Sequence, residues 1–158
     1  MWKDLISVLQ KIFLAYEEIL VLSEKKNLAL RHINVKEVDA IVKREQVLVK
    51  TIETLEMERK NILHSIEQTE KVNIKKMLDA TKFCDKKISN QIEIIHQGLK
   101  DLLFKIEKSN KENACLTRQT LELMNYKINI LSETSVGTTY AKFGQESVST
   151  TKMFEIKA

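Results

Sequence analysis

One pair of residues in this chain has the spacing of a metal site. Glu93 and His96 form a Glu-x-x-His motif, which a helix presents on one face and which supplies half of the ligands of a di-iron bundle. Such a bundle needs a second copy of the motif, but the residues three positions before His32 and His64 are not acidic. The ligand set is therefore incomplete, and the sequence predicts neither a metal site nor a cofactor.

The two cysteines give no better indication of catalysis. Cys84 and Cys115 fall within predicted helices, and neither has a histidine within one helical turn to act as a base. We interpret each as a small apolar packing residue. This local search does not address a catalytic triad whose residues come from distant parts of the sequence. The sequence accordingly predicts that the protein is not an enzyme.

Composition indicates a small number of long helices. The 158 residues include no proline and three glycines, so the chain is poor in the residues that turns between strands require. Its 43% hydrophobic and 30% charged residues fit amphipathic helices rather than a disordered chain. The sequence therefore predicts an all-α protein.

The charges suggest neither nucleic acid nor a membrane as the partner. The 26 basic residues alternate with 22 acidic ones, which gives a net charge of +4, and no block of five basic residues occurs. The apolar N-terminal segment is interrupted by Lys11, Glu17 and Glu18, so it resembles neither a signal peptide nor a membrane span. We expect a soluble cytoplasmic protein without membrane insertion.

Apolar residues recur at steps of three and four along most of the chain, which predicts three helices. The first is expected at Trp2–His32 and the second at Val35–Gln68, with Asn34 as its N-cap and Glu37 completing a capping box. The third is expected at Lys82–Leu131. Residues 69–81 have a weaker pattern, and the sequence does not fix the boundary there.

The predicted third helix is longer than the other two. At 1.5 Å per residue it spans roughly 75 Å, against roughly 45–50 Å for each of the others. Two shorter helices folded against it leave part of its apolar stripe uncovered, and such a stripe binds a partner helix or a second copy of the chain. Periodicity ends near Ser132, so we expect a helical domain over 1–131 and a flexible Ser/Thr-rich tail over 132–158.

Three stretches resemble the FlgN-like family of flagellar type III export chaperones. They are the opening helix with its W-x-x-L start and LALRH, the segment KREQVLVKTIETLEMERKNIL at 43–63, and NKENACL at 110–116 continuing into TTYAKFGQ. The order of these stretches carries the resemblance, because helical heptads alone are common. Ala141 departs from the pattern, since many members have glycine directly after the tyrosine.

The resemblance implies an antiparallel, coiled-coil-like bundle of three long helices that binds the C-terminal segments of hook–filament junction proteins. Members keep this cargo unassembled and deliver it to the export gate. By position, Tyr140 would dock on the cytoplasmic domain of the gate; from the residues alone, it could equally fold back onto the bundle. The cargo-binding residues would be Leu116, Leu121, Met124, Ile128 and Leu131.

Two points stay open at this level. A structural coiled-coil protein that forms a homodimer through its third helix is the alternative to a chaperone. Neither the oligomeric state nor the particular junction protein can be derived from the sequence.

Overall fold

The computed structural model describes residues 1–72, 74, 79 and 81–140, with side chains up to residue 132. Its elements are α1 (Trp2–Arg31), α2 (Val35–Glu70), the short 3₁₀ helix η1 (Thr81–Phe83) and α4 (Lys86–Tyr140). The described residues contain no strand. The predicted all-α fold is therefore confirmed, and α4, with 55 residues, is the longest helix.

The chain divides into two compact units, Met1–Thr120 and Leu121–Ala158. The sequence predicts a domain boundary after Leu131, where the periodicity of apolar residues weakens. Helix α4 nevertheless continues nine residues past Leu131, to Tyr140. Serine and threonine have only moderately low helix propensity, so the polar stretch after Leu131 does not by itself end a helix. Most of the predicted tail, 141–158, lies outside the described residues.

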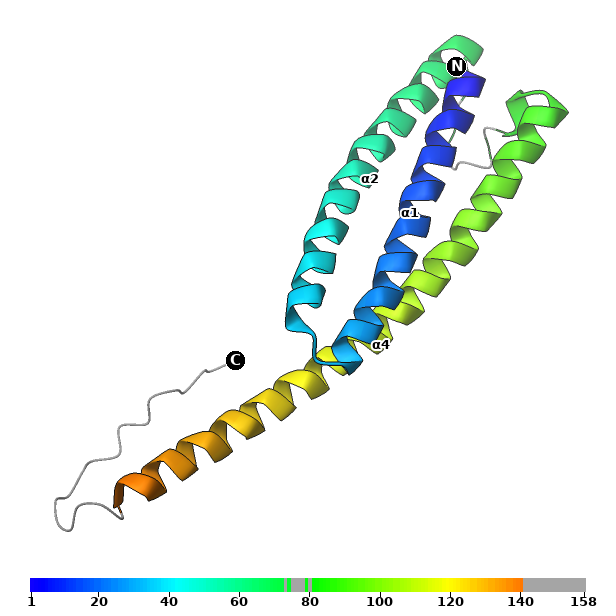
Figure 1. Ribbon diagram of the computed structural model, residues 1–158. Coiled ribbons are helices and arrows are strands. Elements are labelled where there is room, and N and C mark those ends of the chain that lie inside the picture. The colour runs from blue at the N-terminus through cyan, green and yellow to red at the C-terminus, as the bar shows by residue number, and fades with distance from the viewer. Residues whose placement is uncertain (73, 75–78, 80, 141–158) are drawn as a thin grey trace. The chain divides into compact units, whose positions relative to one another are not determined.

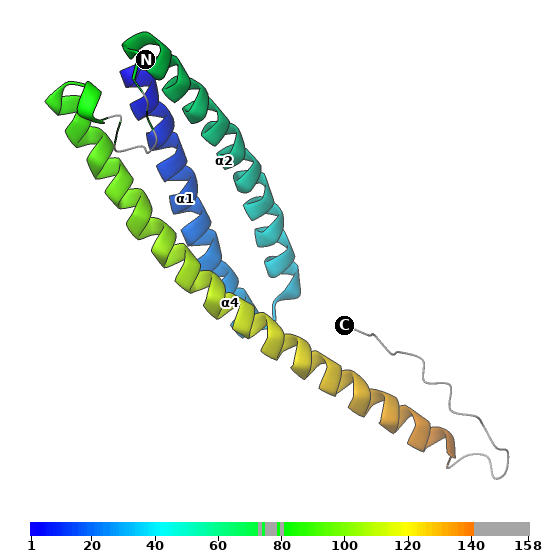
Figure 2. The same ribbon diagram turned by 180° about the vertical axis from the view of Figure 1, so that it is seen from behind.

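In the first unit, α1 lies between α2 and the N-terminal part of α4 (Figures 1 and 2). Consecutive helices are antiparallel, as predicted, so α1 and α4 run in the same direction. The contacts show this directly, because Phe13 approaches Gly98 and Ser23 bonds to Ser109, at nearly the same offset along the two helices.

Two apolar clusters fill the first unit, and the predicted helix faces supply them. The middle cluster contains Ala15, Ile19, Leu48, Ile52, Leu102 and Ile106. The N-terminal cluster contains Leu5, Leu9, Ile66 and Ile92. Each fully buried Leu or Ile stabilises the fold by about 1.5–3 kcal/mol through removal of apolar surface from water.

The turn between α1 and α2 uses the predicted cap with one change. The Asn34 side chain accepts a hydrogen bond from the Glu37 backbone N–H at 3.3 Å. In a capping box the glutamate accepts from the backbone N–H of the cap residue, but here that N–H donates to the Ala29 carbonyl. Glu37 therefore accepts from the Asn34 side-chain amide at 2.8 Å instead. Ile33 has a φ of 54°, the left-handed conformation that commonly ends a helix.

Helix α4 begins four residues later than predicted. Residues Thr81–Phe83 form η1, and the first α-helical hydrogen bond runs from the Ser89 N–H to the Asp85 carbonyl. Aspartate is a favoured N-cap residue, which explains the start after Asp85. Gly98, inside α4, is explained by close packing, because an added Cβ would lie 3.0 Å from the Phe13 ring.

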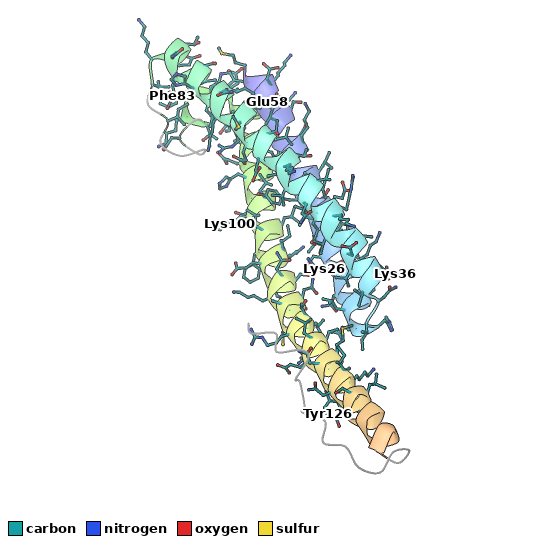
Figure 3. All side chains as sticks on the ribbon, turned by 90° about the vertical axis from the view of Figure 1, so that its left-hand side faces the viewer. Lys26, Lys36, Glu58, Phe83, Lys100 and Tyr126 are labelled. Atoms are coloured by element: carbon teal, nitrogen blue, oxygen red, sulfur yellow. The ribbon has the colours of Figure 1, made fainter. Side chains whose placement is uncertain are left out.

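Charged residues on the inner face of α2 are paired. Glu45 lies on the predicted apolar seam and accepts two hydrogen bonds from Lys26 of α1, at 2.8 and 2.7 Å. Both side chains are 17% exposed, so the pair lies at the edge of the core rather than inside it. Figure 3 labels Lys26 at this position. Arg59 is similarly paired with Glu56 at 2.7 Å.

Candidate functional site

The groups that suggested chemistry in the sequence are not brought together. Among the described residues, no three His, Cys, Asp or Glu side chains are placed to hold a metal ion. Glu93 accepts a hydrogen bond from Ser89 at 3.0 Å. Burial, reinforced by the nearby Asp85, raises the pKa of the Cys84 thiol. A reactive cysteine needs a lowered pKa, so this environment does not activate Cys84.

The sequence-predicted cargo residues differ in exposure. Leu116 is half-buried and belongs to the first unit, whereas the other four lie on α4 within the second unit. Three of those four, Leu121, Ile128 and Leu131, are 56 to 68% exposed, and Met124 is half-buried. We define the seam stripe as Leu121, Met124, Ile128 and Leu131. Within the described part of the chain, this exposure leaves apolar surface that a partner protein can contact.

The same stretch of α4 carries a second exposed apolar row that sequence reasoning missed. Leu123, Tyr126 and Ile130, defined here as the second stripe, are 41 to 63% exposed. They follow the same steps of three and four, which was the signal that could have found them. Figure 3 shows Tyr126 on the surface of α4.

The two stripes lie on different sides of α4. At 100° of rotation per residue, their centres are separated by about 150°. Glu122, Asn125 and Asn129 lie in the wider gap between the two stripes, and Lys127 lies in the narrower gap; all four are exposed. A surface helix normally has one apolar stripe opposite a broad polar face, so a helix with apolar residues on two sides is built to be buried.

This arrangement is suited to binding helices rather than small molecules. A partner helix can lay its apolar side chains against each stripe, as in other helix-in-groove complexes. The predicted docking residue, Tyr140, is the last residue of α4, and its side chain lies outside the described part of the structure.

No helix within the described ranges combines the length and apolar character needed to cross a membrane.

Comparison with known proteins links the chain to one family. The family model described as "FlgN protein" matches residues 1–147. The chain is also similar to "Uncharacterized protein YvyG" of Bacillus subtilis (strain 168), with 26% identity over 160 residues that cover 99% of this chain and 98% of that protein. No solved structure matches the chain.

Proposed function

This chain belongs to the FlgN family of flagellar export chaperones, and we propose that it binds the C-terminal segments of hook–filament junction proteins. Its role is then to cover their apolar helices in the cytoplasm, so that the junction proteins stay unassembled until export. The seam stripe on α4 supports this assignment, because three of its apolar side chains are more than half exposed. Its family is one of chaperones rather than enzymes, and binding of flagellar cargo is the activity its members share.

Masking follows from simple physical chemistry. On this proposal, the apolar helices that the chaperone buries are those through which the junction proteins assemble, so binding competes with assembly. Burial of apolar surface contributes about 25 cal/mol per Å² to such binding, before the entropic cost of association is subtracted. Release to the export gate then requires only that another partner compete for the same surface.

A seam-stripe variant tests cargo binding. Leu121→Ser, Ile128→Ser and Leu131→Ser together should lower the affinity for a co-expressed junction protein by at least about tenfold, since three apolar contacts are lost. The helical content should stay unchanged, because these side chains are more than half exposed. Co-purification and circular dichroism measure the two quantities.

The chain offers a matched control for that variant. Leu14, Val21 and Leu28 are equally apolar side chains on α1, 48 to 62% exposed and at heptad spacing. Serine at these three positions should leave capture at the wild-type level. Capture at full yield by the seam-stripe variant would refute the proposed cargo surface. A free chain that is dimeric, with a seam-stripe variant that is monomeric, would favour the structural coiled-coil alternative.

Delivery to the gate is proposed to depend on Tyr140. Tyrosine has a large amphipathic side chain, and it is enriched among residues that dominate binding energy. Tyr140→Ala should leave capture of the junction protein intact and lower binding of the loaded chaperone to the cytoplasmic domain of the export gate. Tyr140→Phe is the control and should retain most of the binding. Equal binding of wild type and Tyr140→Ala in a pull-down would show that Tyr140 is not part of the docking site.

A further inference from the structure

The second stripe is too small to act as an independent interface. Its three side chains are 41 to 63% exposed, so they present on the order of 300 Å² even if each were as large as an aromatic side chain. A stable protein interface buries about 800 Å² on each partner. The second stripe therefore needs to be part of a larger contact surface.

The seam stripe alone falls short as well. Three side chains at 56 to 68% exposure and the half-buried Met124 present on the order of 400 Å². Together the two stripes present on the order of 700 Å², close to the area of a standard interface. One binding event that covers both stripes reaches that size, whereas an event that covers either stripe alone does not.

A single helix cannot cover both stripes. One packed helix contacts an apolar stripe about 100° wide, and the two stripe centres are about 150° apart. The partner therefore has to contact α4 from two sides. In the first unit, α1 has the same kind of environment, because α2 lies along one of its sides and α4 along the other (Figure 1).

A second copy of this chain does not satisfy the geometry. In a symmetric dimer the same surface is used on both chains, so two copies of α4 would bury one stripe on each and leave the other in water. Covering the remaining stripe would require further copies in an open array. A single partner with two helical segments covers both stripes in one complex.

We propose that the junction protein binds residues 121–131 of α4 with two amphipathic helical segments, one on the seam stripe and one on the second stripe. This inference rests on the proposed chaperone function. Glu122, Asn125 and Asn129, in the wider gap between the stripes, then form the side of α4 that stays in water. The cargo-binding surface is thus larger than the seam stripe, which a single cargo helix would cover. It also includes Leu123, Tyr126 and Ile130.

A comparison of the two stripes tests the proposal. Leu123→Ser, Tyr126→Ser and Ile130→Ser together should lower the affinity for a full-length junction protein by at least about tenfold, as the seam-stripe variant does. The α1 variant with serine at positions 14, 21 and 28 serves as the control for nonspecific apolar contacts. Light scattering of each free chain measures its mass, and circular dichroism measures its helical content.

The outcomes separate the inference from the function on which it rests. If the second-stripe variant binds cargo like wild type while the seam-stripe variant does not, a single helix binds and the inference is wrong, but the function stands. If both variants bind like wild type, the cargo surface lies elsewhere and the inference is wrong, but the function again stands. If the wild-type chain itself does not bind the junction protein, the proposed function fails. If the second-stripe substitutions leave cargo binding intact but convert a dimer to a monomer, the stripe contacts a second copy and the inference is overturned.

A single substitution covers the case in which the triple variant loses helical content. Tyr126→Ser changes the most exposed side chain of the second stripe and should lower cargo affinity about threefold without change in the fold. Wild-type affinity of this variant would count against the second stripe in the same way.

Discussion

Replacing Ile92 by alanine should lower the free energy of unfolding by about 3–4 kcal/mol. Ile92 is 0% exposed and packs in the N-terminal cluster, where α1, α2 and α4 meet through Leu5, Leu9 and Ile66. The substitution removes three carbons from a site that neighbouring helices cannot easily close, so the cost of a cavity adds to the lost burial. Urea unfolding followed by circular dichroism measures the change.

Helix α4 supplies a matched control two residues away. Ile94 is 71% exposed, so Ile94→Ala removes the same atoms from a position already in water. Its effect should stay within about 0.5 kcal/mol of wild type. Equal losses for the two variants would mean that the packed face of α4 does not include Ile92, and the alignment of all three helices in the first unit would then be wrong.

Helix positions and packed faces could be predicted from the sequence because both depend on local periodicity. Leu48 and Ile52 on α2, and Leu102 and Ile106 on α4, follow the four-residue step of an apolar helix face, and all four are buried. The Asn34 cap was also predictable, since a cap depends on residues within one turn.

Helix ends were harder to predict because their signals are weak in this chain. Helix α2 ends at Glu70, and the next residue, Lys71, adopts a φ of 53° without the glycine that usually marks this conformation. Ile33 does the same after α1. A side chain in this conformation costs about 1–2 kcal/mol, so only the surrounding packing and hydrogen bonds specify such positions.

Half of the candidate site could be predicted, and the other half could not. The seam stripe continues the periodicity of the core, so Leu121 and Ile128 followed from spacing. The second stripe has no buried counterpart earlier in α4, and only the exposure of Tyr126 and its neighbours distinguishes it from scattered surface residues. Asn113 is a polar interruption of the seam, and its partner on α1 lies 90 residues away, so the contact is set by tertiary packing and not by local sequence.

That polar interruption is a hydrogen-bonded node between α1 and α4. The Asn113 side-chain amide donates to the Ser23 carbonyl at 2.8 Å and to the Ser23 hydroxyl at 3.0 Å, and both residues are buried. Ser23 also shares a 2.7 Å hydrogen bond with Ser109. Because a buried polar group is stable only with its partner opposite, the node favours one alignment of α1 against α4.

The node predicts a large effect from a small chemical change. Asn113→Asp keeps the shape of the side chain but replaces the donating NH₂ group by oxygen. At neutral pH a buried carboxylate would then face the Ser23 carbonyl oxygen, and the Ser23 hydroxyl, 3.0 Å from the replaced nitrogen, is the group of the node that could turn to donate to it. The free energy of unfolding should fall by about 3–5 kcal/mol, because a buried charge is added to the lost hydrogen bond to the Ser23 carbonyl.

The loss should depend on pH in a direction that identifies the charge as its cause. Burial and the Ser23 carbonyl oxygen disfavour the carboxylate, so the pKa of the carboxyl group introduced at position 113 is raised in the folded protein above the unfolded value of about 3.9. The folded state then keeps a proton that the unfolded state has released. Stability relative to wild type should be highest below about pH 4, where the protonated acid can donate to Ser23, and should fall as pH rises through the folded pKa.

Asn110→Asp is the matched control. Asn110 is exposed, and its side-chain oxygen accepts a hydrogen bond from Ser23 at 3.3 Å. Because a carboxylate is an equally good acceptor, this substitution should have little effect on stability at any pH. A pH-independent loss in Asn113→Asp would show that the cost comes from altered packing rather than from buried charge.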